Sequence, residues 1–303
     1  MQPKLFQLSN AMTRSPNTLL ILVVAALLIV GAIITSKFKR NPKSQVEALP
    51  EQISEPISSE QEALRMEDLI RLAESSLEHM ATHLADYTAR FEKIEVDLEK
   101  NTSELSEMRL KVQTRFRNKQ TDSPRRIYIK FNLPDSVSGR EVIWREDKYE
   151  GKMAVHEIGF LIGLKTLWLD PTGLIAMQGQ RHPVSELGIV KLTEQLISRG
   201  KKDLKNPSIK IHSRQDYEFD GQEARMITVI RDQPLSEPDD FQKAEIIMDL
   251  ERNLVLSFRS YVKAETEDNG YQLTESYSYF DLQTNVQLTE SDFDITNEEY
   301  QFP

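Results

Sequence analysis

The chain has 303 residues and carries 38 Lys and Arg against 48 Asp and Glu, a formal net charge of −10. The first 43 residues hold six basic and no acidic side chains, which leaves 32 basic and 48 acidic groups and a charge of −16 for the remainder. A domain this acidic is repelled by nucleic acid, which is therefore excluded as a partner. The absence of Cys excludes disulfides, thiolate chemistry and an acylated lipoprotein anchor.

An uncharged apolar stretch runs from Leu19 to Ile34. As a helix it would be about 28 Å long at roughly 1.5 Å per residue, enough to cross the hydrocarbon core of a bilayer. We expect residues 1–17 to be a short N-terminal segment and residues 18–36 a transmembrane anchor. A removed signal peptide is the alternative, with Val30-Gly31-Ala32 as its small-residue cleavage site. The length of the stretch and the basic residues that follow it favour the anchor.

Residues 37–58 are predicted to form a basic collar and a tether. Four basic side chains lie between Lys37 and Lys43, and the following residues mix Pro, Ser, Gln and Glu with few large apolar groups. From residue 59 to residue 303 the apolar pattern continues without another linker of this kind. We therefore expect a single domain over residues 59–303.

Two helices are predicted in this domain. The first shows apolar residues at three- and four-residue spacing, and Ser59 with Glu62 would form a capping box at its start. The second is predicted from Ser185 to Ser198, ending near Gly200. The apolar residues of the first helix are Met66, Ile70, Ala73, Leu77, Met80 and Leu84.

The rest of the domain alternates between apolar and polar residues, which is typical of strands with one buried face. Asp220-Gly221 is the strongest hairpin signal. The segment Asp170-Pro171-Thr172-Gly173 is predicted as a second hairpin turn, with Gly173 at a position of positive φ. About ten strands with two or three helices predict an α+β fold, with a curved, unclosed antiparallel sheet and the helices on its concave side.

Several segments resemble an uncharacterised bacterial family known only as a domain of unknown function. They are residues 87–93, 139–144 and 181–184, the strand at 277–282, and the tail at 292–294 and 297–303. The last strand and the tail also resemble periplasmic lipoprotein carriers of the LolA type. The resemblance covers roughly residues 69–303, and Gly139-Arg140-Glu141-Val142 and the tail are its more specific parts.

The resemblance implies an unclosed half-barrel whose concave face forms an apolar cavity for acyl chains. The chain differs from the carriers in its predicted anchor and in an extra charged stretch, residues 118–126. Because an anchored shuttle could not cross a periplasm, we expect a stationary relative. The resemblance also favours a periplasmic domain behind an inner-membrane anchor, although the two basic residues before the apolar stretch and four after it would by themselves favour a cytoplasmic domain.

The predicted ligand-binding residues lie in one apolar segment and on nearby strands. Phe160, Leu161 and Ile162 belong to the most apolar segment of the domain, where two Gly residues indicate a lid or lip. A buried connection is the alternative interpretation of that segment. On the strands, Trp144, Trp168 and Phe131 are the predicted cavity residues, and ordinary core packing is the alternative.

Arg181 is the candidate contact for a ligand headgroup, because a guanidinium binds phosphate and carboxylate groups well. The alternative is that Arg181 and His182, next to Pro183, satisfy exposed backbone carbonyls. Two further histidines, His79 and His83, have a spacing that can bind a metal. They project away from the apolar side of their helix with no Glu between them, so we predict a solvated face and no metal site.

The sequence contains no nucleophile elbow, P-loop or dinucleotide fingerprint. We therefore predict no catalytic residue, no cofactor and no enzymatic activity. The leading hypothesis is an anchored cell-envelope protein that binds a lipid or the acyl chains of a lipoprotein in its half-barrel cavity. The alternative is an envelope protein-interaction or sensing module whose cavity is filled by its own helix and whose acidic surface binds a partner.

Overall fold

The computed structural model describes residues 62–98, 100, 102–118, 122–159, 163–232, 240–264 and 270–303. The predicted anchor at residues 18–36 and the predicted tether lie outside these ranges. Within them, no helix is both long and apolar enough to span a membrane.

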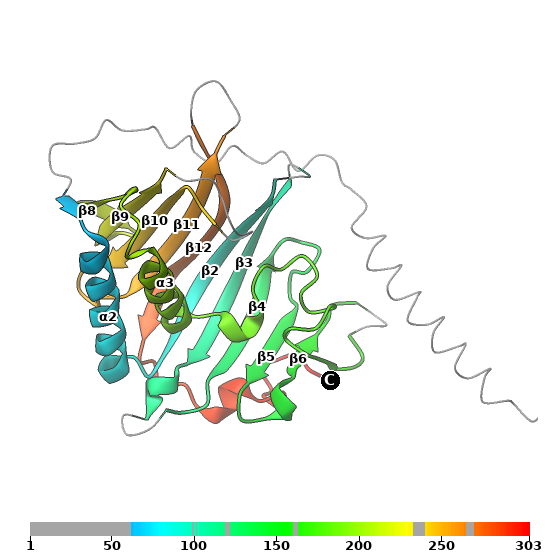
Figure 1. Cartoon of the computed structure of the whole chain (residues 1–303). Helices are drawn as coiled ribbons and strands as arrows, with labels where there is room; N and C mark the ends of the chain where they lie inside the picture. The colour runs from blue at the N-terminus through cyan, green and yellow to red at the C-terminus, as the bar shows by residue number, and fades with distance from the viewer. Residues whose placement is uncertain are drawn as a thin grey trace, which may run out of the picture. The chain divides into compact units, whose positions relative to one another are not determined.

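In the described residues, twelve antiparallel strands form one open sheet in the order β1-β8-β9-β10-β11-β12-β2-β3-β4-β5-β6-β7 (Figure 1). Consecutive strands pair from β2 to β7 and from β8 to β12, and the pairing of β12 with β2 joins the two series. The strands are β1 Glu62–Leu64, β2 Asp86–Asp97, β3 Thr102–Gln113, β4 Arg126–Leu133, β5 Glu141–Arg145, β6 Met153–His156, β7 Leu167–Leu169, β8 Ile209–Phe219, β9 Gln222–Arg231, β10 Lys243–Asp249, β11 Val255–Lys263 and β12 Tyr271–Thr284.

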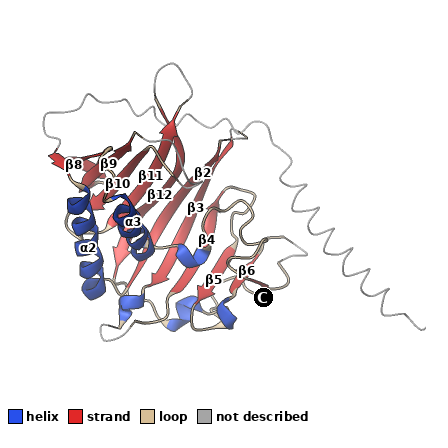
Figure 2. Cartoon of the chain, viewed as in Figure 1, coloured by secondary structure: helices blue, strands red, loops and turns tan. Residues whose placement is uncertain are grey.

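Two α-helices of the described chain, α2 (Met66–His83) and α3 (Ile189–Asp203), lie on the same face of this sheet (Figure 2). We call this the inner face. The described residues also form four short 3₁₀ turns, η1 (Arg115–Arg117), η2 (Tyr149–Gly151), η3 (Val184–Glu186) and η4 (Glu290–Phe293). The predicted α+β class with an open antiparallel sheet is confirmed, with twelve strands where about ten were expected.

The first helix begins later than predicted. Glu62, expected in a capping box, lies in β1, where it pairs with Ser213 of β8. The helix instead starts at Met66, after Arg65, whose backbone N–H donates to Asp68 Oδ2 at 3.2 Å. Three residues of strand were too few to produce a readable alternation.

The second helix continues past its predicted end. Gly200 lies inside α3 because this is where α3 contacts α2. A Cβ atom at Gly200 would lie 2.9 Å from Ile70 Cγ1 and 3.4 Å from Met66 Sδ. The glycine therefore permits a close approach of the two helices and does not end α3.

The predicted hairpin at Asp170 to Gly173 is wrong. The turn exists, with Gly173 N donating to Asp170 O at 3.0 Å and Thr172 N to Asp170 Oδ1 at 2.8 Å. However, the described residues from 170 to 188 contain no second strand, and Gly173 does not have positive φ. Met177 N donates to Gly173 O at 2.9 Å, so the chain enters a helical turn instead of reversing into a ladder.

The outer face of β4 to β6 is covered by the C-terminal tail. Phe293 is fully buried there. It packs in one cluster with Tyr128, Ile143 and Ala154, against which Leu288, Ile295, Tyr300 and Phe302 also pack. The sheet is therefore covered on both faces in this region, by the tail outside and by the elements described next inside.

Candidate functional site

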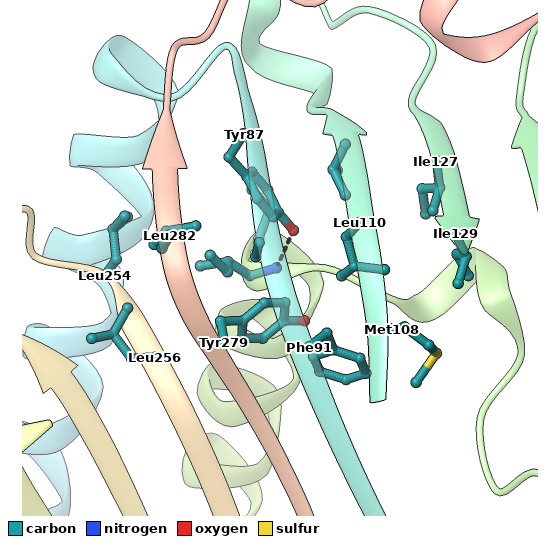
Figure 3. Packing of buried hydrophobic residues seen from close by; sticks show 14 of the residues in the cluster. Tyr87, Phe91, Met108, Leu110, Ile127, Ile129, Leu254, Leu256, Tyr279 and Leu282 are labelled. Atoms are coloured by element: carbon teal, nitrogen blue, oxygen red, sulfur yellow. Dashed lines mark hydrogen bonds between the residues drawn. The ribbon is translucent and has the colours of Figure 1, made fainter. Parts of the chain in front are cut away.

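A continuous apolar floor occupies the inner face from β2 to β6. Residues paired across neighbouring antiparallel strands share a face, so the register of these strands places one apolar row beside the next. Every side chain of this floor is at most 8% exposed. Figure 3 shows its part on β2 to β4, with Phe91, Leu110 and Ile129 labelled. The apolar floor consists of Phe91, Met108, Leu110, Ile127, Ile129, Val142, Trp144, Met153 and Val155.

A buried tyrosine fixes helix α3 above the sheet. Tyr87 is fully buried, and its hydroxyl accepts a hydrogen bond from the backbone N–H of Ile189 at 3.1 Å (Figure 3). This bond satisfies one of the amide groups left free at a helix start. Gly188 precedes it with φ of 122°, and a Cβ atom there would lie 3.2 Å from the same hydroxyl. The start of α3 is thus set by Gly188, which leaves room for the Tyr87 hydroxyl, and by the hydrogen bond from Ile189 to Tyr87 of β2.

Residues 163–188, which we call the cover segment, lie between β6 and α3. Four of their side chains, Leu169, Ala176, Val184 and Leu187, are partly buried and pack against the cluster that contains the apolar floor. The backbone hydrogen bonds of residues 170–187 are local, as from Met177 to Gly173 and from Leu187 to Val184. Beyond β7, side chains hold this segment to the sheet.

Three consecutive residues of the cover segment make polar contacts with the sheet, and we call these contacts the clasp. The amide oxygen of Gln180 lies 2.5 Å from Lys93 Nζ of β2. Arg181 Nη2 donates to the carbonyl oxygen of Val96 at 3.0 Å. The third residue, His182, approaches a buried carboxylate on β12. The clasp therefore lies at the end of β2 that points away from Tyr87.

Glu275 of β12 is the centre of the clasp. Its Oε2 atom lies 3.7 Å from Arg181 Nη1 and 3.8 Å from His182 Nε2. The Tyr277 hydroxyl is 2.9 Å from Glu95 Oε1 and 3.1 Å from Glu275 Oε2, so its single proton is shared between two carboxylates. These two glutamates are direct cross-strand partners. The cover segment thus brings positive charge to a pair of like charges.

The clasp shifts the pKa values of its members. Burial alone raises the pKa of Glu275, but the contact with His182 and the charges of His182 and Arg181 outweigh it and hold that pKa below its ordinary value. The same contact with Glu275 raises the pKa of His182 against the effect of burial. Burial and the nearby charges of Glu275 and Glu95 raise the pKa of Tyr277, which stays a neutral donor.

Two of the predicted cavity residues lie on the inner face. Trp144 is buried in the apolar floor, where its Nε1 donates to Gly151 O at 3.2 Å and the Arg125 guanidinium lies 5.1 Å from its ring. Phe131 extends the same face of β4 and is partly buried, with the Arg140 guanidinium 5.7 Å from its ring. Both side chains face the cover segment's side of the sheet.

Trp168 occupies a different position. It pairs with Ala154, which belongs to the outer-face cluster, so the register places Trp168 on the outer face. Its ring lies 4.6 Å from that of Tyr149. Phe160, Leu161 and Ile162 lie outside the described residues.

Arg181 combines both interpretations drawn from the sequence. It bonds a backbone carbonyl, as the structural interpretation expected, and it also faces the buried carboxylate of Glu275, which was not among the predicted site residues. A weak signal for that carboxylate existed, because Glu275 shares its strand parity with the apolar-facing Tyr277 and Tyr279. A charged residue in a buried row marks a polar site, but it does not identify the partner.

A second polar centre joins two segments that carried the family resemblance. Glu141 is fully buried on the outer face; its Oε1 accepts from the Tyr128 hydroxyl at 2.9 Å, and its Oε2 accepts from the backbone N–H of Gln301 at 2.7 Å. Lys130 Nζ lies 3.4 Å from Oε1. Glu141 therefore fixes the C-terminal tail to the sheet, and its role is structural.

The histidines on α2 stack on each other, with ring centroids of His79 and His83 4.2 Å apart. His83 Nδ1 lies 2.5 Å from Thr82 Oγ1. Across the described ranges, no three His, Asp or Glu side chains are grouped to hold a metal ion.

A groove of about 620 Å³ opens near the β8–β9 turn. It is lined by polar and acidic side chains and lies away from the apolar floor, so it does not correspond to the predicted cavity. Its lining is Glu62, Ser213, Gln215, Asp216, Tyr217, Glu218, Gly221, Gln222 and Glu223.

Comparison with known proteins gives a family and distant structural likenesses. A family model described as "Protein of unknown function (DUF1571)" matches residues 84–302, which confirms the predicted membership of an uncharacterised family. No curated protein matches the chain.

Similar solved structures include a putative outer membrane lipoprotein-sorting protein domain from Vibrio parahaemolyticus, with 14% identity over 76% of this chain and 97% of that chain and a TM-score of 0.33. They also include a DUF1329 family protein from Desulfovibrio piger, with 11% identity over 76% and 97% and a TM-score of 0.35. A LolA superfamily protein from Nitrosomonas europaea has 9% identity over 73% and 97% and a TM-score of 0.28. At these scores the likenesses assign no ligand to this chain.

Proposed function

The chain belongs to the DUF1571 family, and from that premise we propose that its domain binds a lipid, or the acyl chains of a lipoprotein, on the apolar floor beneath the cover segment. The observation that carries the proposal is the construction of the cover segment. Among the described residues, the inner side chains of residues 170–187 are apolar, their backbone hydrogen bonds are local, and their polar contacts with the sheet are those of the clasp. Such a segment can separate from the sheet without breaking a strand ladder.

The shape of the floor supports an elongated apolar ligand. It crosses five strands, β2 to β6, which at about 4.8 Å per strand spacing is roughly 19 Å. When residues 170–188 lift, Ala176, Val184 and Leu187 lose apolar contacts, and an acyl chain lying across the floor would replace them. A compact polar ligand would leave those contacts unreplaced.

The clasp supplies the polar end of the proposed site. Opening separates Arg181 from Glu275, so this guanidinium becomes available to an anionic headgroup. Lys93 loses its contact with Gln180 but keeps its ion pair with Glu95 at 3.3 Å. Phe160, Leu161 and Ile162 precede the cover segment in the sequence, and their role at the mouth of the cavity stays a prediction. Trp168 is not included in the proposed floor because of its place on the outer face.

We further infer that the domain is held at the inner membrane of a bacterial envelope by the uncharged stretch from Leu19 to Ile34, with the domain in the periplasm. Binding of this kind requires no catalytic group or cofactor. Alkaline phosphatase fused after Pro303 is expected to be active in cells, and a reporter that works only in the cytoplasm is expected to be inactive there. The reverse pattern would contradict this topology.

A second candidate function is favoured by the burial of the floor. Because its side chains are at most 8% exposed, the cover segment and helices already fill the inner face in this structure. A protein that never opens would be an interaction or sensing module, with its acidic surface toward an envelope partner. The two candidates differ in whether the inner face accepts a ligand.

Uptake of a fluorescent fatty acid by the full chain in lipid nanodiscs separates them. The ligand-binding proposal requires saturable binding above that of empty nanodiscs, with one site per chain. It also requires His182→Ala, which weakens the clasp, to speed uptake, whereas Gln178→Ala on an exposed part of the same segment leaves the rate unchanged. Absence of saturable binding would favour the interaction module.

A further inference from the structure

The clasp leaves a carboxylate without its positive partners when the cover segment lifts. In the closed structure Arg181 Nη1 lies 3.7 Å and His182 Nε2 3.8 Å from Glu275 Oε2. Both side chains belong to the cover segment and move away with it. Glu95, the cross-strand partner of Glu275, keeps Lys93 of its own strand at 3.3 Å. Opening therefore takes the positive partners of Glu275 and leaves that of Glu95.

The groups that stay beside Glu275 are neutral hydroxyls. Ser260 Oγ lies 3.1 Å from its Oε1 atom, and the Tyr277 hydroxyl lies 3.1 Å from its Oε2 atom. When an acyl chain covers the adjoining floor, it excludes water from this carboxylate again. A buried carboxylate without a cation is costly. A ligand that brings its own cation to Oε2 would therefore bind better than one that does not.

Glu275 lies next to the apolar floor, so one ligand can reach both. Tyr277 stacks on Phe91 of the floor with ring centroids 6.3 Å apart, and its hydroxyl bonds Glu275. Phe91 also packs against Tyr279 of the same strand, at 4.8 Å between ring centroids (Figure 3). A single tyrosine side chain thus separates the apolar surface from the charged one. An acyl chain on the floor would have its polar end at this carboxylate.

The chemistry of the site distinguishes between kinds of headgroup. A primary ammonium has three N–H donors, and its hydrogen bonds to carboxylate oxygens are charge-assisted and strong, whereas a quaternary ammonium has no N–H to donate. Arg181, once separated from Glu275, can bind a phosphate. These two opposite charges are 3.7 Å apart in the closed structure. A headgroup with an ammonium and a phosphate a few bonds apart would supply the counter-charge of each.

We propose that the ligand is a phospholipid with a primary ammonium headgroup, whose ammonium replaces Arg181 at Glu275 and whose phosphate binds the freed Arg181. This assignment rests on the proposed function, because it requires that the floor binds acyl chains. It goes further in making Glu275 the residue that selects the headgroup. A phospholipid with an anionic headgroup would bring negative charge to two glutamates and is disfavoured by repulsion.

Competition between lysophospholipids that share one acyl chain and differ in the headgroup tests the assignment. The full chain in phosphatidylcholine nanodiscs is loaded with the fluorescent fatty acid, and each lysophospholipid is titrated against it. Lysophosphatidylethanolamine should displace the fatty acid at a concentration about tenfold or more below that of lysophosphatidylglycerol, which is the discrimination expected of one hydrogen-bonded charge pair. Lysophosphatidylcholine, which has the positive charge but no N–H, should require more than lysophosphatidylethanolamine.

Glu275→Gln should abolish the preference for ethanolamine over glycerol. The substitution also loosens the cover segment, but a change in opening alters the affinity for every acyl ligand by the same factor, so the ratio between two lysophospholipids reports the headgroup alone. Glu223→Gln removes the same charge from an exposed position on β9, and this matched control should retain the wild-type ratio. Binding of the fluorescent fatty acid shows that each variant is folded.

The outcomes separate this assignment from the proposed function. Equal displacement by the ethanolamine and glycerol lysophospholipids, or a preference that survives Glu275→Gln, would overturn the headgroup assignment alone, since the fatty acid would still occupy the floor. Equal displacement by the ethanolamine and choline lysophospholipids would overturn the primary ammonium. Absence of saturable fatty-acid binding would refute the proposed function, and the headgroup assignment with it.

Discussion

Replacing Glu275 by Gln should loosen the cover segment without unfolding the sheet. The substitution keeps the size of the side chain and a hydrogen-bonding oxygen, but it removes the negative charge that faces Arg181 and His182. The positive groups would then remain beside Lys93 without their central counter-charge. The expected result is a larger population of the state in which residues 170–188 are lifted from the floor.

The size of the effect follows from the distances and the exposure of the partners. Unit charges about 4 Å apart interact by roughly 4 kcal/mol at an effective dielectric constant of about 20. Arg181 and His182 are 29% and 36% exposed, so water screens much of this Coulomb energy. The amide oxygen of the new glutamine side chain can still accept a hydrogen bond and recovers part of the remaining interaction. We expect a net loss of about 1–2 kcal/mol, equivalent to a roughly 5- to 30-fold increase in opening.

Amide hydrogen exchange followed by mass spectrometry measures this opening directly. Peptides from residues 170–188 should exchange about 5- to 30-fold faster in Glu275→Gln, while peptides from β3 and β4 keep the wild-type rate. Glu104→Gln is the matched control, since Glu104 of β3 lies on the same face of the sheet as Glu275 but is exposed. Unchanged exchange in the cover segment, or equal acceleration across the sheet, would refute the clasp.

Three further predictions concern pH, helix packing and the tail. Because the pKa of His182 is raised in the folded protein, the contribution of this residue to the clasp is complete below its ordinary pKa and is lost as pH rises through the raised value. Fatty-acid uptake should therefore be faster at about pH 8.5 than at about pH 6. Equal rates would contradict this. Gly200→Ala should lower the free energy of unfolding in urea by about 1–2 kcal/mol, because overpacking against Ile70 exceeds the gain of about 1 kcal/mol in helix propensity, and the loss should shrink when combined with Ile70→Ala. Glu141→Gln should release the C-terminal tail, at a cost of about 1–3 kcal/mol. The NH2 group of the new side chain would replace one accepting oxygen and would face the Gln301 N–H or another donor. Carboxypeptidase digestion that remains as slow as in wild type would contradict this.

The sheet could be predicted from the sequence because its information is local. The alternation of Ile127, Ile129 and Phe131 along β4 places the strand and its buried face without knowledge of any partner. The turn signal at Asp220-Gly221 likewise lies between β8 and β9. Strand β1 was missed because three residues are too few to establish a period.

The errors arose where a residue serves a distant contact. Gly200 looks like a helix end in its own sequence, and only Ile70 on the neighbouring helix explains it. The turn at Asp170 has hairpin residues, but the chain continues from it into helical turns, and only residues further along, Ala176, Val184 and Leu187, pack against the cluster that contains the floor. Trp168 was assigned to the cavity by its residue type, and only the register with Ala154 reveals its face.

The candidate site was predictable in part. Arg181 and His182 drew attention as unusual residues before Pro183, whereas Glu275 lies 93 residues after His182, and no local pattern joins them. The buried Glu275 becomes tolerable beside a second glutamate because Arg181 and His182 of a separate segment supply positive charge to it. Such compensation is a property of the folded chain and is not visible in either segment alone.

Quenching of Trp144 by a brominated fatty acid tests the central claim most directly. Trp144 is part of the apolar floor, and in the Trp168→Phe variant it is the single tryptophan of the chain. With the full chain in nanodiscs, the account predicts saturable quenching that an unbrominated fatty acid of the same length reverses by competition. Trp144 emission that stays constant while the brominated fatty acid is raised to saturation would contradict binding on the floor.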